Sequence, residues 1–183
     1  MSFLKLVRAN NWVKNLFILL PLFFSGQFLN IEKLIETFYI IIGFSLATSF
    51  VYIVNDIFDI DFDKIHPEKR HRPIPSGKVS ISFSLILSTI LLSIGLLILW
   101  LLSKTSFLLT IFYVILNFFY SYRLKQIPII DFIIVSIGFI IRILIGGDIG
   151  NVELTQWMII MVFLLSLFIS VTKRRDDVYQ YEF

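Results

Sequence analysis

Six long apolar runs, separated by short polar segments, are the feature that most constrains the fold of this 183-residue chain. A bilayer core about 30 Å thick is crossed by roughly 20 apolar residues in an α-helix, so we predict an all-α polytopic membrane protein. Only 16% of the residues are charged, against about 25% in soluble proteins, which argues against an ordinary soluble domain. The predicted spans are Trp12–Leu29, Thr37–Val54, Ile81–Leu102, Ser106–Tyr122, Pro128–Ile145 and Leu154–Val171.

The basic residues are distributed unevenly between the two sides of these spans. If the N-terminus is cytoplasmic, 13 of the 16 Lys and Arg residues fall on the inner side, with only Lys33 and Lys104 outside and Arg142 within a span. Cytoplasmic loops of membrane proteins are enriched in Lys and Arg. We therefore predict an integral protein of the plasma membrane, with cytoplasmic termini and a polar site at the cytoplasmic helix ends.

The longest hydrophilic segment, residues 55–73, follows the second span and begins with regularly spaced aspartates. If the helix continues, its rotation of about 100° per residue places Asp56, Asp59 and Asp63 in an arc about 60° wide, with Asn55 beside it. Such close carboxylates repel one another unless a cation lies among them, and Mg²⁺ binds carboxylates together with substrate phosphates. The alternative is a solvated loop in which the aspartates pair with neighbouring Lys and Arg residues. The helical phasing favours the metal site.

A basic run follows the aspartates directly. Pro67 disfavours helix at His66, so we expect the helical extension to end there. The basic run contains Lys69, Arg70 and Arg72, and the enrichment of cytoplasmic loops in basic residues accounts for part of it. An acidic face beside an arginine cluster is also what a magnesium-pyrophosphate site requires. The carboxylates hold the metal, and guanidinium groups bind the phosphate oxygens that the metal does not contact. The two interpretations are compatible.

Several of these motifs resemble the UbiA superfamily of intramembrane transferases. The aspartate motif from Asn55 to Asp63 is similar to the first aspartate-rich motif of that superfamily, and other segments resemble its decaprenyl-phosphate phosphoribosyltransferase branch. The resemblance implies a UbiA-type bundle of nine membrane helices, of which six are predicted here. We therefore expect residues 1–183 to form a single domain that is incomplete at its C-terminal end. The other similar segments are Arg8–Asn15, His66–Ile74, Tyr120–Lys125, Asp131 and Gly138–Arg142.

The resemblance implies Mg²⁺-dependent transfer of a 5-phosphoribosyl group from phosphoribosyl pyrophosphate to a polyprenyl phosphate such as decaprenyl phosphate. Pyrophosphate is released, and an anionic acceptor needs no general base. Asp56, Asp59 and Asp63 would then be the catalytic, metal-binding residues. No nucleic-acid partner is expected, and the oligomeric state stays open. The predicted substrate-binding residues are Lys14, Asn15, Asn55, Lys69, Arg70, Arg72, Lys173, Arg174, Asp176 and Asp177.

The second acidic motif of the superfamily, two aspartates four residues apart after the sixth span, is altered here. Asp176 and Asp177 are adjacent, and the residues four positions after them are Gln180 and Tyr181. This departs from the aromatic prenyltransferases and favours the phosphoribosyl branch. Asp176 and Asp177 either bind metal or ribose, or only balance the three cations of residues 173–175.

Two other functions stay open at this point. One is a UbiA-type enzyme that moves a polyprenyl group from its diphosphate to an aromatic acceptor. The other is a non-catalytic membrane component or transporter, which would require ionisable residues across the middle of the membrane. We expect Arg142 to reach the interface or pair near Asp148 rather than contact a substrate. We expect Asn117 to form an interhelical hydrogen bond rather than a catalytic one. Lys14 is either an interfacial anchor or a substrate ligand.

Overall fold

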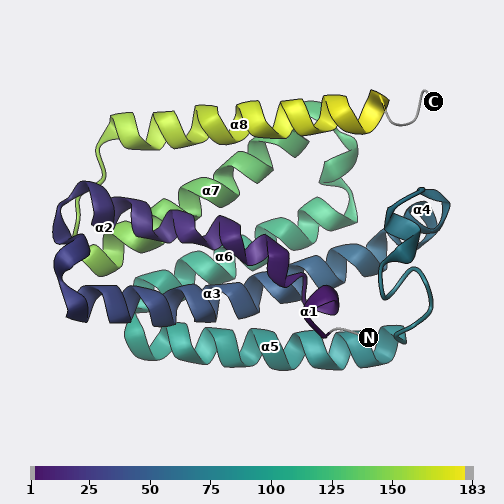
Figure 1. Ribbon diagram of the computed structural model, residues 1–183, viewed down its shortest axis with the longest axis horizontal. Coiled ribbons are helices and arrows are strands. Elements are labelled where there is room, and N and C mark those ends of the chain that lie inside the picture. The colour runs from purple at the N-terminus through teal and green to yellow at the C-terminus, as the bar shows by residue number, and fades with distance from the viewer. Residues whose placement is uncertain (1–2, 180–183) are drawn as a thin grey trace.

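The computed structural model describes residues 3–179, apart from the side chains of Pro128 and of residues 173–179. The regular elements of this part of the chain are all helices, and the long ones lie side by side along the longest dimension of the molecule (Figure 1). The elements, with η for a 3₁₀-helix, are α1 (Phe3–Leu6), η1 (Ala9–Leu19), α2 (Leu20–Phe24), η2 (Gln27–Leu29), α3 (Ile31–Phe58), α4 (Ile60–Ile65), η3 (Lys69–His71), α5 (Ile81–Leu102), α6 (Lys104–Tyr122), η4 (Leu124–Gln126), α7 (Pro128–Gly150) and α8 (Gln156–Tyr179).

Four helices of the described chain, α3, α5, α6 and α7, are long and apolar enough to cross a membrane. They match the second to fifth predicted spans. The apolar part of α8, Gln156–Thr172, is shorter, and the first predicted span consists of η1 and α2 rather than one long α-helix. The count of six spans is therefore not confirmed, and the first and sixth spans stay predictions.

The local structure of the first predicted span follows in part from Pro21. This residue has no N–H, so it cannot donate an α-helical hydrogen bond to the Phe17 carbonyl, and the Leu20 N–H donates to that carbonyl instead. A 3₁₀-helix rises about 2.0 Å per residue, against about 1.5 Å in an α-helix. The 11 residues of η1 and the five of α2 therefore extend about 30 Å, close to the thickness of a bilayer core.

Helix α3 lies at the centre of the bundle and packs closely on α5. A Cβ atom added at Gly95 of α5 would lie 2.5 Å from the Gly43 carbonyl oxygen of α3, so only glycine permits this approach. Small residues at helix contacts are typical of membrane bundles, in which van der Waals packing drives association. The buried cluster around this contact includes Ile18, Phe44, Leu99, Tyr113 and Ile141, from η1, α3, α5, α6 and α7.

The polar segments that connect α3 to α5 and α6 to α7 lie at one end of the bundle. Helix α4, the short helix α1 and the last turns of α8 lie toward this end (Figure 1). Lys125, between α6 and α7, forms an ion pair with Asp59, between α3 and α4. Two of the segments that the sequence predicts on the cytoplasmic side are thereby brought together, and the candidate site lies between them.

Candidate functional site

The aspartate motif lies where α3 passes into α4. Asp59 separates the two helices with φ −96° and ψ 4°, while hydrogen bonds from Asp59 N–H to the Asn55 carbonyl (3.0 Å) and from Asp63 N–H to the Asp59 carbonyl (2.7 Å) keep the turns nearly continuous. Helix α4 ends at Ile65, and His66 is extended with ψ 134°. The predicted end of the helical extension before Pro67 is confirmed.

Asp56 and Asp63 are buried and share a basic partner. Arg72 Nη1 donates to Asp56 Oδ1 at 3.1 Å and to Asp63 Oδ2 at 2.6 Å, so the two carboxylates face one guanidinium group. Arg8 binds Asp56 through both of its oxygens, with Nε 2.9 Å from Oδ2 and a second bond from Nη2 to Oδ1. Such bidentate pairs are among the strongest polar contacts in proteins. Arg8 belongs to a segment that carries the resemblance but was not predicted as a site residue.

Asp59 turns toward a different cation. Its Oδ1 pairs with Lys125, and its Oδ2 accepts a hydrogen bond from Asn55 Nδ2 at 3.0 Å. Asn55 in turn accepts from Ser121 Oγ of α6 at 3.2 Å. Asn55 therefore orients Asp59 and joins α3 to α6. Lys125 lies in a segment that carries the resemblance but was not predicted as a site residue.

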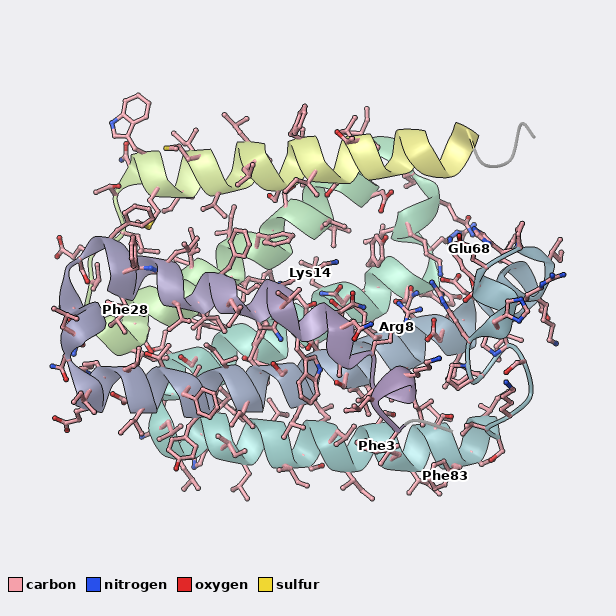
Figure 2. The ribbon with its side chains drawn as sticks, in the orientation of Figure 1. Phe3, Arg8, Lys14, Phe28, Glu68 and Phe83 are labelled. Carbon is pink, nitrogen blue, oxygen red and sulfur yellow. The ribbon has the colours of Figure 1, made fainter. Side chains whose placement is uncertain are left out.

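The loop after α4 folds around His66. The imidazole Nδ1 accepts from the backbone N–H groups of Glu68 (3.2 Å) and Lys69 (3.4 Å). Figure 2 shows Glu68 at the tip of the bundle, beyond Arg8. The loop turns Lys69 and Arg72 toward the site, whereas Arg70 is exposed and donates from Nε to the neighbouring His71. The predicted ligand Arg70 is therefore not among the residues that line the cavity at this end of the bundle, which is described next.

A cavity of about 560 Å³, which we call the outer cavity, lies between these segments and helices α7 and α8. Ligand pockets commonly have volumes of about 300–1,000 Å³. One wall is polar and carries both carboxylates and cations, and the wall from α7 and α8 is largely apolar. The charged and amide side chains that line the outer cavity include Arg8, Lys14, Asn55, Asp59, Asp63, Lys69, Arg72, Lys125 and Asp131. Its apolar lining residues on α7 and α8 are Phe132, Val135, Phe139 and Ile169.

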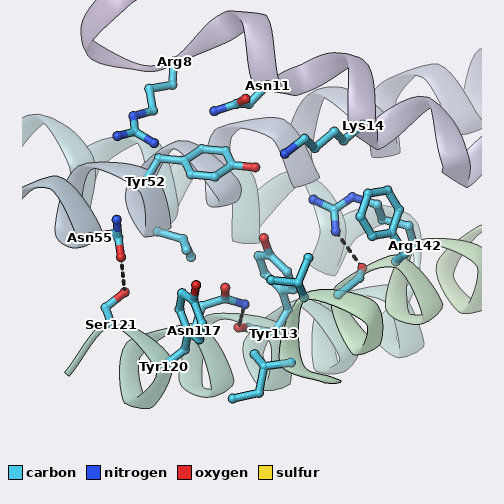
Figure 3. A pocket seen from close by; sticks show the side chains of 15 residues that line it. Arg8, Asn11, Lys14, Tyr52, Asn55, Tyr113, Asn117, Tyr120, Ser121 and Arg142 are labelled. Atoms are coloured by element: carbon cyan, nitrogen blue, oxygen red, sulfur yellow. Dashed lines mark hydrogen bonds between the residues drawn. The ribbon is translucent and has the colours of Figure 1, made fainter. Parts of the chain in front are cut away.

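A second cavity of about 210 Å³, the inner cavity, lies deeper in the bundle between η1, α3, α6 and α7 (Figure 3). The two cavities are neighbours, because six residues line both of them: Arg8, Lys14, Asn55, Tyr120, Val135 and Phe139. The inner cavity also receives the side chain of Arg142.

The structure corrects three predictions about single polar residues. Arg142 does not pair near Asp148: it is buried, and its Nε donates to Asn15 Oδ1 at 2.9 Å. Asn15 is fully buried, so in this structure it positions Arg142 and lines neither cavity. Asn117 donates from Nδ2 to the Tyr113 carbonyl, one turn away on its own helix, at 2.8 Å, so this hydrogen bond is not interhelical.

Lys173, Arg174, Asp176 and Asp177 follow the lining residue Ile169 in the last turns of α8. Their side chains lie outside the described part of the chain, so their roles stay predictions.

The donor chemistry of the aspartate motif suits a hard divalent cation, because two carboxylates already meet at one guanidinium nitrogen and two line the outer cavity. The described residues do not, however, include three carboxylates or imidazoles gathered into one metal-ligand group. Arg8, Arg72 and Lys125 lie close enough to neutralise the aspartates, and Asp59 pairs apart from the other two.

Comparison with known proteins decides the family. The sequence profile of the UbiA prenyltransferase family matches residues 17–183. This chain belongs to the UbiA prenyltransferase family. The predicted resemblance is confirmed, and with it the all-α membrane fold.

Among curated UbiA relatives, the decaprenyl-phosphate phosphoribosyltransferase of Mycolicibacterium smegmatis is 32% identical over 177 residues, which cover 93% of this chain and 55% of the relative. The enzyme of that name from Mycobacterium tuberculosis is 31% identical over 179 residues, 96% of this chain and 59% of the relative. The chain thus spans little more than half the length of these relatives.

Solved structures agree with the UbiA fold. A UbiA homolog from Archaeoglobus fulgidus bound to DMAPP and Mg²⁺ superposes with a TM-score of 0.79 at 20% identity, over 91% of this chain and 60% of that one. A digeranylgeranylglyceryl phosphate synthase structure gives a TM-score of 0.74 at 24% identity, over 90% of this chain and 57% of the other. At these identities the likeness supports the shared fold.

Proposed function

We propose that the protein transfers a 5-phosphoribosyl group from phosphoribosyl pyrophosphate to a polyprenyl phosphate such as decaprenyl phosphate, with release of pyrophosphate. The observation that carries this proposal is the outer cavity, whose polar wall combines five basic side chains with carboxylates while its opposite wall is largely apolar. A phosphate-rich sugar donor suits the first wall and a lipid acceptor suits the second. The relatives at 31–32% identity are named for the same acceptor, decaprenyl phosphate, and for transfer of the same phosphoribosyl group.

In the proposed reaction, the bond between the anomeric carbon and the pyrophosphate oxygen breaks, and its electron pair leaves with pyrophosphate. An oxygen of the acceptor phosphate forms the new bond to that carbon. Because the acceptor is already anionic, none of the lining residues needs to remove a proton. Lys69, Arg72 and Lys125 stabilise the negative charge that develops on the leaving group, while Phe132 and Ile169 contact the start of the prenyl chain.

Asp56, Asp59 and Asp63 would hold Mg²⁺, which supplies positive charge to the pyrophosphate oxygens when bound. Two of these carboxylates line the outer cavity, and the third holds Arg8 and Arg72 beside it. By their position after Ile169 on α8, Asp176 and Asp177 are further candidates for contact with the metal or the ribose. The basic residues at this end of the bundle support a cytoplasmic site at the plasma membrane.

The test is incorporation of label from ribose-labelled phosphoribosyl pyrophosphate into the lipid fraction of membranes that contain the protein and decaprenyl phosphate. We expect Mg²⁺-dependent labelling in the wild type and loss of at least about 100-fold in Asp63→Asn, since this change removes a cavity carboxylate. Asp61→Asn is the matched control on the same helix, because the Asp61 side chain is 96% exposed. Equal labelling by Asp63→Asn and wild type would refute the metal-site assignment.

The same assay separates the proposal from prenyl transfer. If the protein moves a polyprenyl group from its diphosphate to an aromatic acceptor, label from the prenyl diphosphate appears in an aromatic lipid and ribose label does not enter the lipid fraction. That result would overturn the proposed function while leaving the family assignment intact.

A further inference from the structure

Arg142 is an unusual cation because it is buried within a helix that is long and apolar enough to cross a membrane. The residue is 3% exposed, and charged side chains inside a bilayer are costly and commonly functional. Its Nε donates to Asn15 Oδ1 at 2.9 Å and its Nη1 to the Gly138 carbonyl at 2.6 Å. None of the ion pairs between described residues includes Arg142. Its two hydrogen-bond partners are neutral, so they hold the group without cancelling its charge.

Three aromatic rings surround the guanidinium group. Its central carbon lies 5.1 Å from the ring centre of Phe44, 5.3 Å from that of Tyr113 and 5.4 Å from that of Phe139. Cation–π contacts of this kind stabilise a desolvated cation and fix its orientation. Arg142 is therefore pre-organised, and its position in the lining of the inner cavity leaves its charge available to an anion there.

The inner cavity has the electrostatic character of an anion site. Arg8, Lys14 and Arg142 line it, and within the described chain none of its lining residues is acidic. Asp56 forms an ion pair with Arg8, and Lys14 and Arg142 are the two other cations that line the cavity. Figure 3 shows their side chains turned toward the same space as the hydroxyl of Tyr52.

We propose that the inner cavity binds a phosphate monoester, with Arg142 and Lys14 as its cationic ligands. This rests on the proposed function, in which two substrates carry such a group: the 5-phosphate of the sugar donor and the phosphate of the lipid acceptor. The lining favours the sugar, because Asn11, Tyr52 and Asn117 offer neutral donors and acceptors that suit ribose hydroxyls.

The position of the inner cavity fits one donor that spans both cavities. Lys14 and Asn55 line both, so a ligand can place its pyrophosphate among the outer cations and its 5-phosphate at Arg142. Arg142 bonds the Gly138 carbonyl one turn nearer the polar end of α7, which directs its guanidinium group toward the outer cavity. Binding at both ends would orient the anomeric carbon between them.

The test measures thermal unfolding of the purified full chain in detergent with added ligands. In the wild type we expect ribose 5-phosphate to raise the unfolding temperature and ribose at the same concentration to leave it unchanged. Arg142→Gln should weaken ribose 5-phosphate binding about tenfold to a hundredfold, the worth of a charged hydrogen bond, while Mg²⁺-pyrophosphate still binds as in the wild type. Asp63→Asn should instead weaken the binding of Mg²⁺-pyrophosphate and leave the binding of ribose 5-phosphate as in the wild type. Arg123→Gln, at an exposed arginine outside both cavities, is the matched control and should bind both ligands normally.

Geranyl phosphate distinguishes the two sources of the phosphate. Protection by geranyl phosphate in place of ribose 5-phosphate, lost in Arg142→Gln, would support the site and assign it to the lipid acceptor. Protection by ribose as strong as by ribose 5-phosphate, or wild-type ribose 5-phosphate affinity in folded Arg142→Gln, would overturn the proposal. If Arg142→Gln does not fold, Lys14→Gln replaces it, and unchanged binding of both phosphate monoesters in that variant is the overturning result.

The two proposals can fail separately. Ribose label in the lipid fraction without any phosphate-monoester binding in the inner cavity would leave the proposed function standing and remove this inference. Binding of ribose 5-phosphate that depends on Arg142, without label transfer, would do the reverse.

Discussion

Asp56 is predicted to stabilise the polar end of the bundle through its two arginines. Its side chain is 4% exposed and accepts two hydrogen bonds from Arg8 and one from Arg72. Asp56→Asn keeps the shape of the side chain but removes the charge and turns one acceptor oxygen into a donor that faces a guanidinium group. Both arginines then lose a buried counter-ion.

The size of the expected loss in unfolding free energy depends on how deeply Arg8 and Arg72 are buried. Removing one member of a fully buried ion pair costs about 3–5 kcal/mol. The side chains of Arg8 and Arg72 are 19% and 29% exposed, and Arg72 keeps its bond to Asp63, so water and the second carboxylate recover part of this loss. We expect Asp56→Asn to lower the free energy of unfolding by about 2–4 kcal/mol.

Reversible unfolding in mixed detergent micelles, followed by circular dichroism, measures this difference. Asp61→Asn is the control because it removes an exposed carboxylate of α4, and it should change the unfolding free energy by less than about 0.5 kcal/mol. An unfolding free energy for Asp56→Asn equal to that of Asp61→Asn would refute the inference that Asp56 holds the two arginines in place.

Three further outcomes are expected. Gly95→Ala should lower the free energy of unfolding by about 1–3 kcal/mol in the same assay, because its methyl group would meet the Gly43 carbonyl oxygen; an unchanged value would contradict the close contact of α3 and α5. Asn15→Leu should raise the KM for phosphoribosyl pyrophosphate more than it lowers kcat, because Arg142 loses its acceptor; an unchanged KM would show that Asn15 does not position the arginine. Removal of divalent ions with EDTA should abolish label transfer and added Mg²⁺ should restore it, whereas transfer in EDTA would exclude a required metal.

Hydropathy predicted where helices occur better than where they begin and end. The span expected at Thr37–Val54 is the longer helix α3, Ile31–Phe58, because Asn30 caps its N-terminus by accepting from the Lys33 N–H and its C-terminal turn carries the aspartate motif. Charged and polar residues continue the helix at both ends without adding to its hydropathy. The end of the helix before Pro67 was predicted correctly, because a proline restricts the backbone of the residue directly before it.

The candidate site was predictable where one helix carries its residues. The 100° spacing places Asp56 and Asp63 on a shared face, and both contact Arg72. The pairing of Asp59 with Lys125 joins residues 66 positions apart, which no local pattern can supply. The same holds for Asn15 and Arg142, 127 positions apart, whose contact depends on how η1 packs against α7.

Mass spectrometry of the lipid product tests the central claim most directly. Membranes containing the protein are incubated with decaprenyl phosphate, phosphoribosyl pyrophosphate and Mg²⁺, and the lipid extract is compared with one from Asp63→Asn membranes. The proposed function predicts a lipid that has gained one phosphoribosyl unit, with one pyrophosphate released for each, and little of it in the variant. Unmodified decaprenyl phosphate in the wild-type extract, with the protein folded and Mg²⁺ present, would contradict it.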